Sequence, residues 1–236
     1  MNPEAQHMSF NGFCSNTLEF LIENRLNDSK SWFEEHKTEY NDFVLSPLKE
    51  LVGELSPHIL ELDPLIGVTP AIGKTISRIY RDTRFSKDKS FFRENMWLVF
   101  MRDKRSCPEW PAFYFDISPM HLSYGMGYYA TSKETLQLFR EYIVKNHPAF
   151  LKALTCYQQQ DTFQFTGEKY KKLQSAALPE PIKDWYVRKN INFDHTSANL
   201  KPTFSKQIVK ELKTGYDILQ PIYAFLCDIQ ERRLKE

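Results

Sequence analysis

The stretch Met96–Ala130 reads MWLVFMRDKRSCPEWPAFYFDISPMHLSYGMGYYA and contains three runs with the composition of β-strands. The first run, Met96–Met101, is apolar without a break, which is typical of a buried strand. The runs Ala112–Ser118 and Leu122–Ala130 are rich in aromatic residues and are separated by a short connection that contains a proline. These runs therefore predict three consecutive strands.

A fourth candidate strand, Thr75–Arg81, precedes this stretch. Short links join the four candidates, which favours an antiparallel meander over βαβ units. Apolar residues at spacings of three and four predict helices before and after the strands. We therefore predict a single α+β domain over residues 11–236. It should have a mainly antiparallel sheet of about four to six strands with the N- and C-terminal helices packed on it. The polar residues 1–10 are expected to be disordered.

Three local features refine this prediction. The motif Thr131-Ser-Lys-Glu134 is a capping box, so a helix should begin there. Asn190–Asp194 has the character of an edge strand. A final helix should begin near Phe204, and Pro221 should break or kink it.

Composition restricts the class of protein. The chain has 236 residues, of which 42% are hydrophobic and 26% charged, as in an ordinary soluble globular protein. A net charge of +1 argues against a general nucleic-acid coat protein. The four cysteines lack metal-ligand spacing, and no apolar run resembles a signal peptide or a membrane span. We expect a cytoplasmic protein with no membrane association, no metal site and no cofactor.

Positive charge is concentrated in one segment. Residues 71–105 contain ten Lys or Arg and four Asp or Glu, a net charge of +6, while the whole chain has +1. Arg78, Arg81 and Arg84 recur at intervals of three. On a strand Arg78 and Arg81 would point to opposite faces, so at least one guanidinium should be desolvated and need an anionic partner, for which Asp82 is the nearest candidate. This segment predicts an anion-facing surface.

The same segment carries a family resemblance. The spacing Arg78-Ile-Tyr-Arg81-Asp82-Thr-Arg84-Phe85, followed by Asp88-Lys89, resembles the signature of the bacterial DUF2461 family. The resemblance covers most of the chain and extends to LEFLIEN (18–24), SWFEEHKTEY (31–40), FYFDISP (113–119), YGMGYYATSKETL (124–136), FSKQIVKEL (204–212) and LQPIYAFL (219–226). It implies a cytoplasmic bacterial protein and brings no activity with it. The family usually has a Pro-Tyr pair after this motif, where the present chain has Phe91-Phe92.

Two further elements join the candidate site. Gly125 and Gly127 match GxGxxA, but a dinucleotide fold would need a helix and a parallel strand directly afterwards, so we interpret them as positions where another backbone approaches closely. The resembling family also has glycines here, which implies that they border the pocket of the arginines. The predicted ligand-binding set is Arg78, Arg81, Asp82, Arg84, Asp88, Lys89, Gly127 and Arg140.

Three functional hypotheses follow. The first is binding or processing of a small anionic ligand, bearing phosphate or carboxylate, at this arginine-rich site; we expect Arg81 to be mainly structural and Arg84 to face the ligand. The second is nucleic-acid binding through residues 78–93, where phenylalanines alternate with cations, although the same pattern arises when aromatic residues anchor a basic loop. The third is a structural ion network in a protein that acts through partner contacts. No GxxxxGK[ST], HExxH or GxSxG pattern occurs, so the sequence assigns no reaction and leaves open whether the protein is an enzyme.

Overall fold

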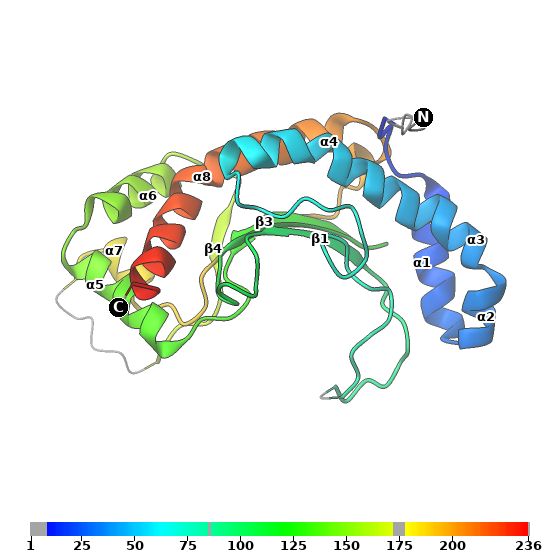
Figure 1. Cartoon of the computed structure of the whole chain (residues 1–236), viewed down its shortest axis with the longest axis horizontal. Coiled ribbons are helices and arrows are strands. Elements are labelled where there is room, and N and C mark those ends of the chain that lie inside the picture. The colour runs from blue at the N-terminus through cyan, green and yellow to red at the C-terminus, as the bar shows by residue number, and fades with distance from the viewer. Residues whose placement is uncertain (1–8, 85, 172–177, 236) are drawn as a thin grey trace.

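The computed structural model describes residues 9–84, 86–171 and 178–235. Within them, five strands form one antiparallel sheet (Figure 1). Across the sheet the order is β1 (Met96–Met101), β2 (Ala112–Ile117), β3 (Leu122–Gly127), β5 (Asn192–Ser197) and β4 (Gln164–Thr166). The first three strands form the predicted meander. The prediction of a single α+β domain is confirmed.

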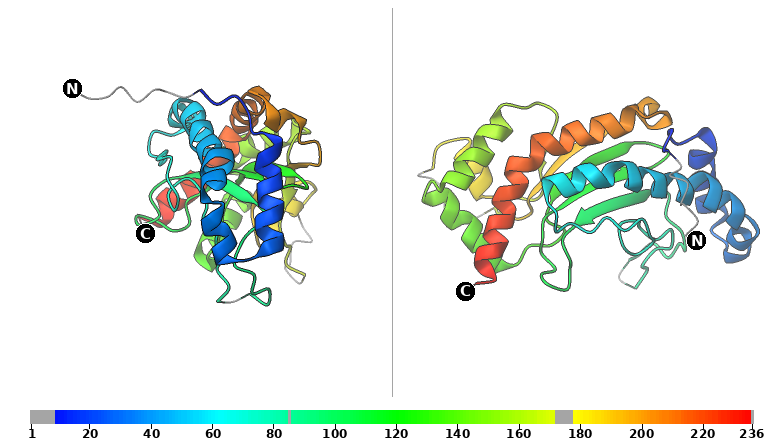
Figure 2. Two further views of the ribbon diagram at one scale, coloured as in Figure 1. Left: turned by 90° about the vertical axis from the view of Figure 1, so that its right-hand side faces the viewer. Right: turned by 45° about the horizontal axis from the view of Figure 1, so that its top comes forward.

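The helices fall into three groups around the sheet (Figures 1 and 2). Two long helices, α4 (Ser46–Leu62) and α8 (Gln207–Arg233), lie across one face. One end of the molecule holds α1 (Ser15–Asn27), α2 (Lys30–Glu35), α3 (Lys37–Glu39) and the π-helix η1 (Tyr40–Leu45). The other end holds α5 (Lys133–Val144), α6 (Pro148–Gln158) and α7 (Ile182–Tyr186), while the 3₁₀ helix η2 (Lys201–Phe204) precedes α8.

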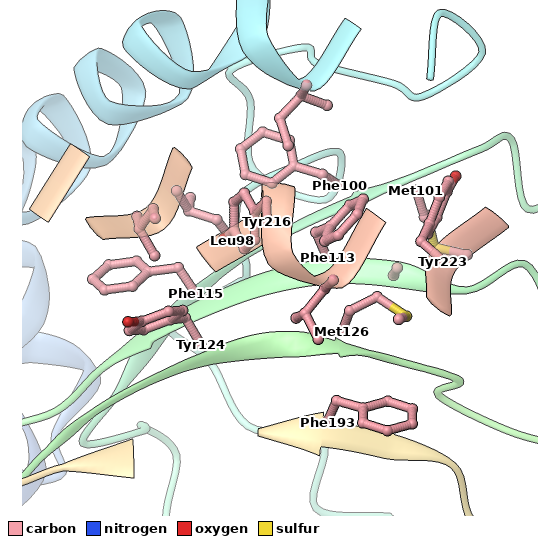
Figure 3. Close-up of a cluster of buried hydrophobic side chains, with 14 of the residues drawn as sticks. Leu98, Phe100, Met101, Phe113, Phe115, Tyr124, Met126, Phe193, Tyr216 and Tyr223 are labelled. Carbon is pink, nitrogen blue, oxygen red and sulfur yellow. The ribbon is translucent and has the colours of Figure 1, made fainter. Parts of the chain in front are cut away.

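The core lies between the sheet and the two long helices (Figure 3). Alternation along β2 directs Phe113 and Phe115 toward the helices, and both side chains are fully buried. On α8, the rings of Tyr216 and Tyr223 lie 5.0 and 4.7 Å from the ring of Phe113. Burial of each such aromatic side chain contributes about 2–3 kcal/mol. This one-sided packing fixes which face of the sheet is covered.

The opposite face of the sheet is left open by the described helices. Figure 1 shows an arched molecule, in which α4 and α8 run along the top, the sheet lies beneath them and the two terminal groups of helices extend past the sheet on its open side. Trp97, Val99, Tyr114 and Ser123 occupy the alternate positions of the strands and are only half-buried. The concave face is therefore the part of the sheet where a ligand has access.

The predicted strand Thr75–Arg81 is wrong, because the structure has only isolated bridges there. Ile76 pairs with Leu98, and Tyr80 pairs with Phe92. The backbone nitrogen of Ser77 donates a hydrogen bond to the carbonyl of Trp97, and that of Arg93 donates to the carbonyl of Ile79. Between these two hydrogen bonds the first segment has one residue, 78, and the second segment has three residues, 94–96. This mismatch interrupts the ladder, so the segment follows the edge of β1 without becoming a strand.

The other local predictions are partly confirmed and partly wrong. β5 lies between β3 and β4, so it is an internal strand and not an edge strand. α8 continues through Pro221 and changes direction along its length (Figure 2). The helix predicted from the capping box does form, with Ser132 as its N-cap. The predicted disorder at 1–10 falls mostly on residues outside the described part, but Phe10 is fully buried against Phe13. In the described part of the chain, no helix has the length and apolar character needed to cross a membrane.

The close approach predicted at the glycines occurs between β3 and β5. A Cβ on Gly125 would lie 2.0 Å from the carbonyl oxygen of Phe193 in the neighbouring strand, and a Cβ on Gly127 would lie 2.5 Å from the carbonyl oxygen of Ile191. Both distances are far inside van der Waals contact. The two strands can therefore pair at this separation only because these positions carry no side chain.

Gly125→Ala is accordingly expected to lower the free energy of unfolding by about 2–3 kcal/mol or more, because the added methyl group displaces β5. Gly67→Ala is the control, since its Cβ would lie 3.6 Å from the carbonyl oxygen of Met101, an ordinary contact. The control should change stability by less than about 1 kcal/mol. Urea unfolding measures both variants, and equal midpoints would contradict the close approach.

Candidate functional site

A cavity of 730 Å³ lies on the concave face of the sheet. This volume is in the range of small-molecule sites. Four neighbouring strands, β1, β2, β3 and β5, supply most of its lining, and the connections next to them supply the rest. The lining residues are Asn95, Trp97, Val99, Met101, Lys104, Ala112, Tyr114, Asp116, Ser123, Gly127, Tyr128, Tyr129, Asn192 and Asp194.

Strand register arranges the polar residues of the cavity in rows. Trp97, Asp116 and Ser123 are cross-strand partners on β1, β2 and β3. In the next row Tyr114 pairs with Gly125, which in turn pairs with Asp194 on β5. Two carboxyl groups therefore share one face of the sheet, two strands apart.

The Asp116 carboxyl group is largely buried, with 15% of its side chain exposed. Asn95 Nδ2 donates a hydrogen bond of 2.5 Å to Asp116 Oδ2, and His121 Nε2 lies 3.9 Å from Oδ1. Burial raises the pKa of Asp116 to about 6, although the Asn95 hydrogen bond and the charges of His121 and Arg93 oppose that rise. Oδ1 accepts no hydrogen bond from any residue in the described part of the chain.

Asp194 is held by two hydroxyl groups. Tyr114 Oη donates to Asp194 Oδ1 at 2.8 Å, and Thr166 Oγ1 donates to Oδ2. The hydroxyl of Ser123 lies 3.1 Å from that of Tyr114. Burial, together with the charge of Asp194, raises the pKa of Tyr114, so the phenol keeps its proton and remains a donor.

Arg93 contacts a residue that lines the cavity, with its guanidinium carbon 4.5 Å from the centre of the Trp97 ring. Burial, and next the positive charge of Arg81, lower the pKa of Arg93. Its Nε is buried without a hydrogen-bond partner. Among residues 9–84, 86–171 and 178–235, no carboxylate forms an ion pair with Arg93. Arg93 is therefore a half-buried cation beside Trp97 with no described carboxylate in ion-pair contact, although the charges of Asp82 and Asp116 act on it from further away.

Arg81 is engaged with a neighbouring loop residue. Its Nη1 lies 3.2 Å from Asp88 Oδ2, which also accepts a hydrogen bond of 2.8 Å from Arg25 on α1. The side chain and backbone of Ser90 bond to Asp88 Oδ1, and these bonds, with the charges of Arg25 and Arg81, lower the pKa of Asp88 to about 2. Asp88 thus links the basic segment, residues 71–105, to α1.

The remaining members of the predicted set lie elsewhere. Arg84 pairs with Asp82 at 2.7 Å on the surface, and Lys89 donates to the Thr83 carbonyl. Arg78 is exposed. Arg140, on α5, donates to the carbonyl oxygens of Tyr186 and Arg188 and lines a separate hollow. From the predicted set, then, Gly127 lines the cavity and Arg81 stands next to the Arg93 that borders it.

The model of a conserved hypothetical protein family, DUF2461, matches residues 16–225. The chain belongs to the DUF2461 family. No curated protein and no solved structure matches it. The match extends from α1 into α8, so the basic segment and the whole cavity fall within the DUF2461 region.

Phe92 stands where the DUF2461 family usually has tyrosine, and its environment is apolar. It is fully buried, with its ring 5.1 Å from Phe33 and 4.8 Å from Tyr80. Phe91 is 45% exposed, and Lys30 Nζ lies 5.0 Å from its ring. The buried position of Phe92 fits an aromatic anchor of the basic segment. Phe85 lies outside the described residues.

Several lining residues were not selected from the sequence, among them Trp97, Tyr114, Asp116 and Asp194, and neither was Arg93 beside Trp97. The signal that could have identified two of them is the alternation in Ala112–Ser118, which places Tyr114 and Asp116 opposite the phenylalanines. Asp194 reaches the cavity through pairing of strands that are distant in sequence, a relation that local patterns do not reveal.

The side chain of Asp28 connects the end of α1 to the basic segment. Its Oδ1 accepts hydrogen bonds from the backbone nitrogens of Phe91 (2.8 Å) and Phe92 (3.1 Å). Asp28→Ala removes both bonds and should lower the free energy of unfolding by about 1–3 kcal/mol. Asp28→Asn keeps an acceptor oxygen and tolerates the left-handed φ of 45°, so it should retain most of the stability. Thermal and urea unfolding of the two variants test this, and equal losses would contradict the role of the side-chain oxygen.

Asp116→Asn is expected to stabilise the protein at pH 7.5 by up to about 3 kcal/mol and to have little effect at pH 4. The folded-state pKa of about 6 lies above the ordinary value of 3.8, so the folded chain binds the proton more tightly than the unfolded chain. Stability therefore falls as pH rises from about 4 to about 6 and stays lower above that range. Asparagine removes this pH-dependent cost.

Urea unfolding at the two pH values checks the sign. Asp103→Asn is the matched control, because Asp103 is an exposed carboxylate whose pKa is lowered by Arg105. That control should show no gain at pH 7.5. A stabilisation by Asp116→Asn of the same size at both pH values would contradict the assignment.

Proposed function

We propose that the concave face of the sheet binds a small anionic ligand that bears phosphate or carboxylate. The observation that carries this proposal is the Arg93 guanidinium, half-buried, stacked on Trp97 and without an anionic partner in the described part of the chain. A desolvated cation costs free energy unless an anion is placed beside it. A ligand anion would supply that partner.

The surroundings of Arg93 support binding by a preorganised site. The Arg93 guanidinium lies over the Trp97 ring, and a planar guanidinium can recognise phosphate or carboxylate through two parallel hydrogen bonds. Arg81 adds positive charge nearby, and Lys104 lines the same cavity. The proposal thus keeps the predicted ligand class and moves its centre from the exposed Arg84 to Arg93.

Nucleic-acid binding through residues 78–93 is the second candidate. It is favoured by the exposed ring of Phe91 within a basic segment. Much of the positive charge of that segment is engaged with Asp82, Asp88 and the Thr83 carbonyl, which makes this candidate weaker. Binding to single strands that weakens steeply with added salt would favour it. A cytoplasmic location belongs to the same set of proposals, and the four free cysteines agree with a reducing compartment.

Thermal unfolding with phosphate monoesters and small carboxylates tests the first proposal. A ligand present at 100 times its dissociation constant should stabilise the native state by about 2.7 kcal/mol and raise the Tm by roughly 5–10 °C. Arg93→Gln should abolish this shift, because it removes the unmatched cation. Arg105→Gln removes the same charge from an exposed side chain outside the cavity and should preserve the shift. If no such anion stabilises the wild type, or if Arg93→Gln responds fully, the proposal is wrong.

A further inference from the structure

Beyond its anionic group, the ligand must match the polar groups on the floor of the cavity. Asp116 Oδ2 is satisfied by Asn95, whereas Oδ1 accepts no hydrogen bond from the described residues. The carbonyl oxygens of β2 are engaged in the ladders with β1 and β3. Asp116 Oδ1 is thus an open acceptor next to the Trp97–Arg93 stack, since Trp97 is the cross-strand partner of Asp116.

A second set of polar groups lies one row further along the sheet. Asp194 already accepts from Tyr114 and Thr166, and each ionised carboxylate oxygen can accept a further bond. Ser123 joins the rows, because its hydroxyl lies 3.1 Å from those of both Tyr114 and Thr196. Asp194 lies one row along the strands and two strands across from Asp116, so the two residues are roughly 12 Å apart. A sugar-sized molecule reaches both carboxyl groups from its opposite ends when a hydrogen bond of about 2.8 Å is added at each end.

We infer that this cavity takes a hydroxyl-bearing anion of the sugar-phosphate class, with its phosphate on Arg93 and its hydroxyl groups donating to Asp116 and Asp194. The inference rests on the proposed function of the same cavity. Tyr129 adds a ring that is 92% exposed and also lines the cavity. Aromatic faces of this kind pack against the apolar face of a ligand while its edge remains hydrogen-bonded.

A hydroxyl group fits Asp116 better than an ammonium group does. An ammonium carries three donors and is satisfied when several acceptors surround it. In the row of Trp97, Asp116 Oδ1 accepts no hydrogen bond from the described residues, and His121 Nε2 lies 3.9 Å from it. A hydroxyl group donates one hydrogen bond to this oxygen and needs no further acceptor. A zwitterionic phosphate is therefore the main competing ligand class, and it can be tested directly.

Calorimetric titration of the full chain with four probes tests the inference. Ribose 5-phosphate and glucose 6-phosphate present phosphate with hydroxyl groups, methyl phosphate presents phosphate alone, and phosphoethanolamine adds an ammonium group. At least one sugar phosphate should bind roughly 10 to 100 times more tightly than methyl phosphate, since each hydroxyl donor to a carboxylate contributes about a factor of ten. Asp116→Leu should reduce that preference at least about fivefold, because it removes the acceptor of the sugar hydroxyl group.

Each outcome separates this inference from the proposal beneath it. Equal affinity for methyl phosphate and both sugar phosphates overturns the inference and leaves anion binding intact. Tightest binding of phosphoethanolamine also overturns it, in favour of a zwitterion. Binding of none of the four phosphates overturns it together with phosphate recognition at Arg93. The comparison of probes on the unmutated protein decides the matter even if Asp116→Leu fails to fold.

Discussion

The packing of α4 and α8 on a single face of the sheet is the constraint on which the rest of the structure depends. Tyr216 and Tyr223 of α8 lie against Phe113, and this contact commits one side of every strand to the core. Because successive side chains alternate, Tyr114 and Asp116 must then point to the other side. The polar lining of the cavity is thus a direct consequence of where the helices pack.

Charge balance explains why the cavity, and not the most basic part of the sequence, is the candidate site. Within residues 71–105 many cations have local partners: Arg84 has Asp82, Arg81 has Asp88, and Arg105 has Asp103. Surface pairs of this kind change stability and recognition little. Arg93 differs because Trp97 holds it and no described carboxylate pairs with it. A local excess of positive charge therefore does not by itself point to Arg93.

The fold was largely predictable from sequence because its signals are local. Continuous and alternating apolar runs identified β1, β2 and β3, and capping residues identified the start of α5. The errors share a cause, since each depends on contacts between distant segments. Thr75–Arg81 has strand composition, but the mismatch with residues 94–96 interrupts its pairing. β5 was assigned to an edge because nothing in its own residues indicates that β4 pairs on its far side. The lining of the cavity was harder to predict for the same reason: Arg81 and Gly127 were selected from motifs, whereas strand register brings Trp97 and Asp194 to the same face of the sheet.

The N-terminal helices and the cavity are mechanically connected through the basic segment. Asp28 binds the backbone of Phe91 and Phe92, Arg25 binds Asp88, and Phe33 packs on Phe92. One residue further along the chain, Arg93 turns onto Trp97 in β1. The position of the unmatched guanidinium is therefore fixed from both sides, by α1 and α2 at one end and by the sheet at the other. An arginine held in this way loses little conformational entropy when an anion arrives. The same contacts give the buried Phe92 a purpose that needs no hydroxyl group: it anchors the backbone from which Arg93 extends.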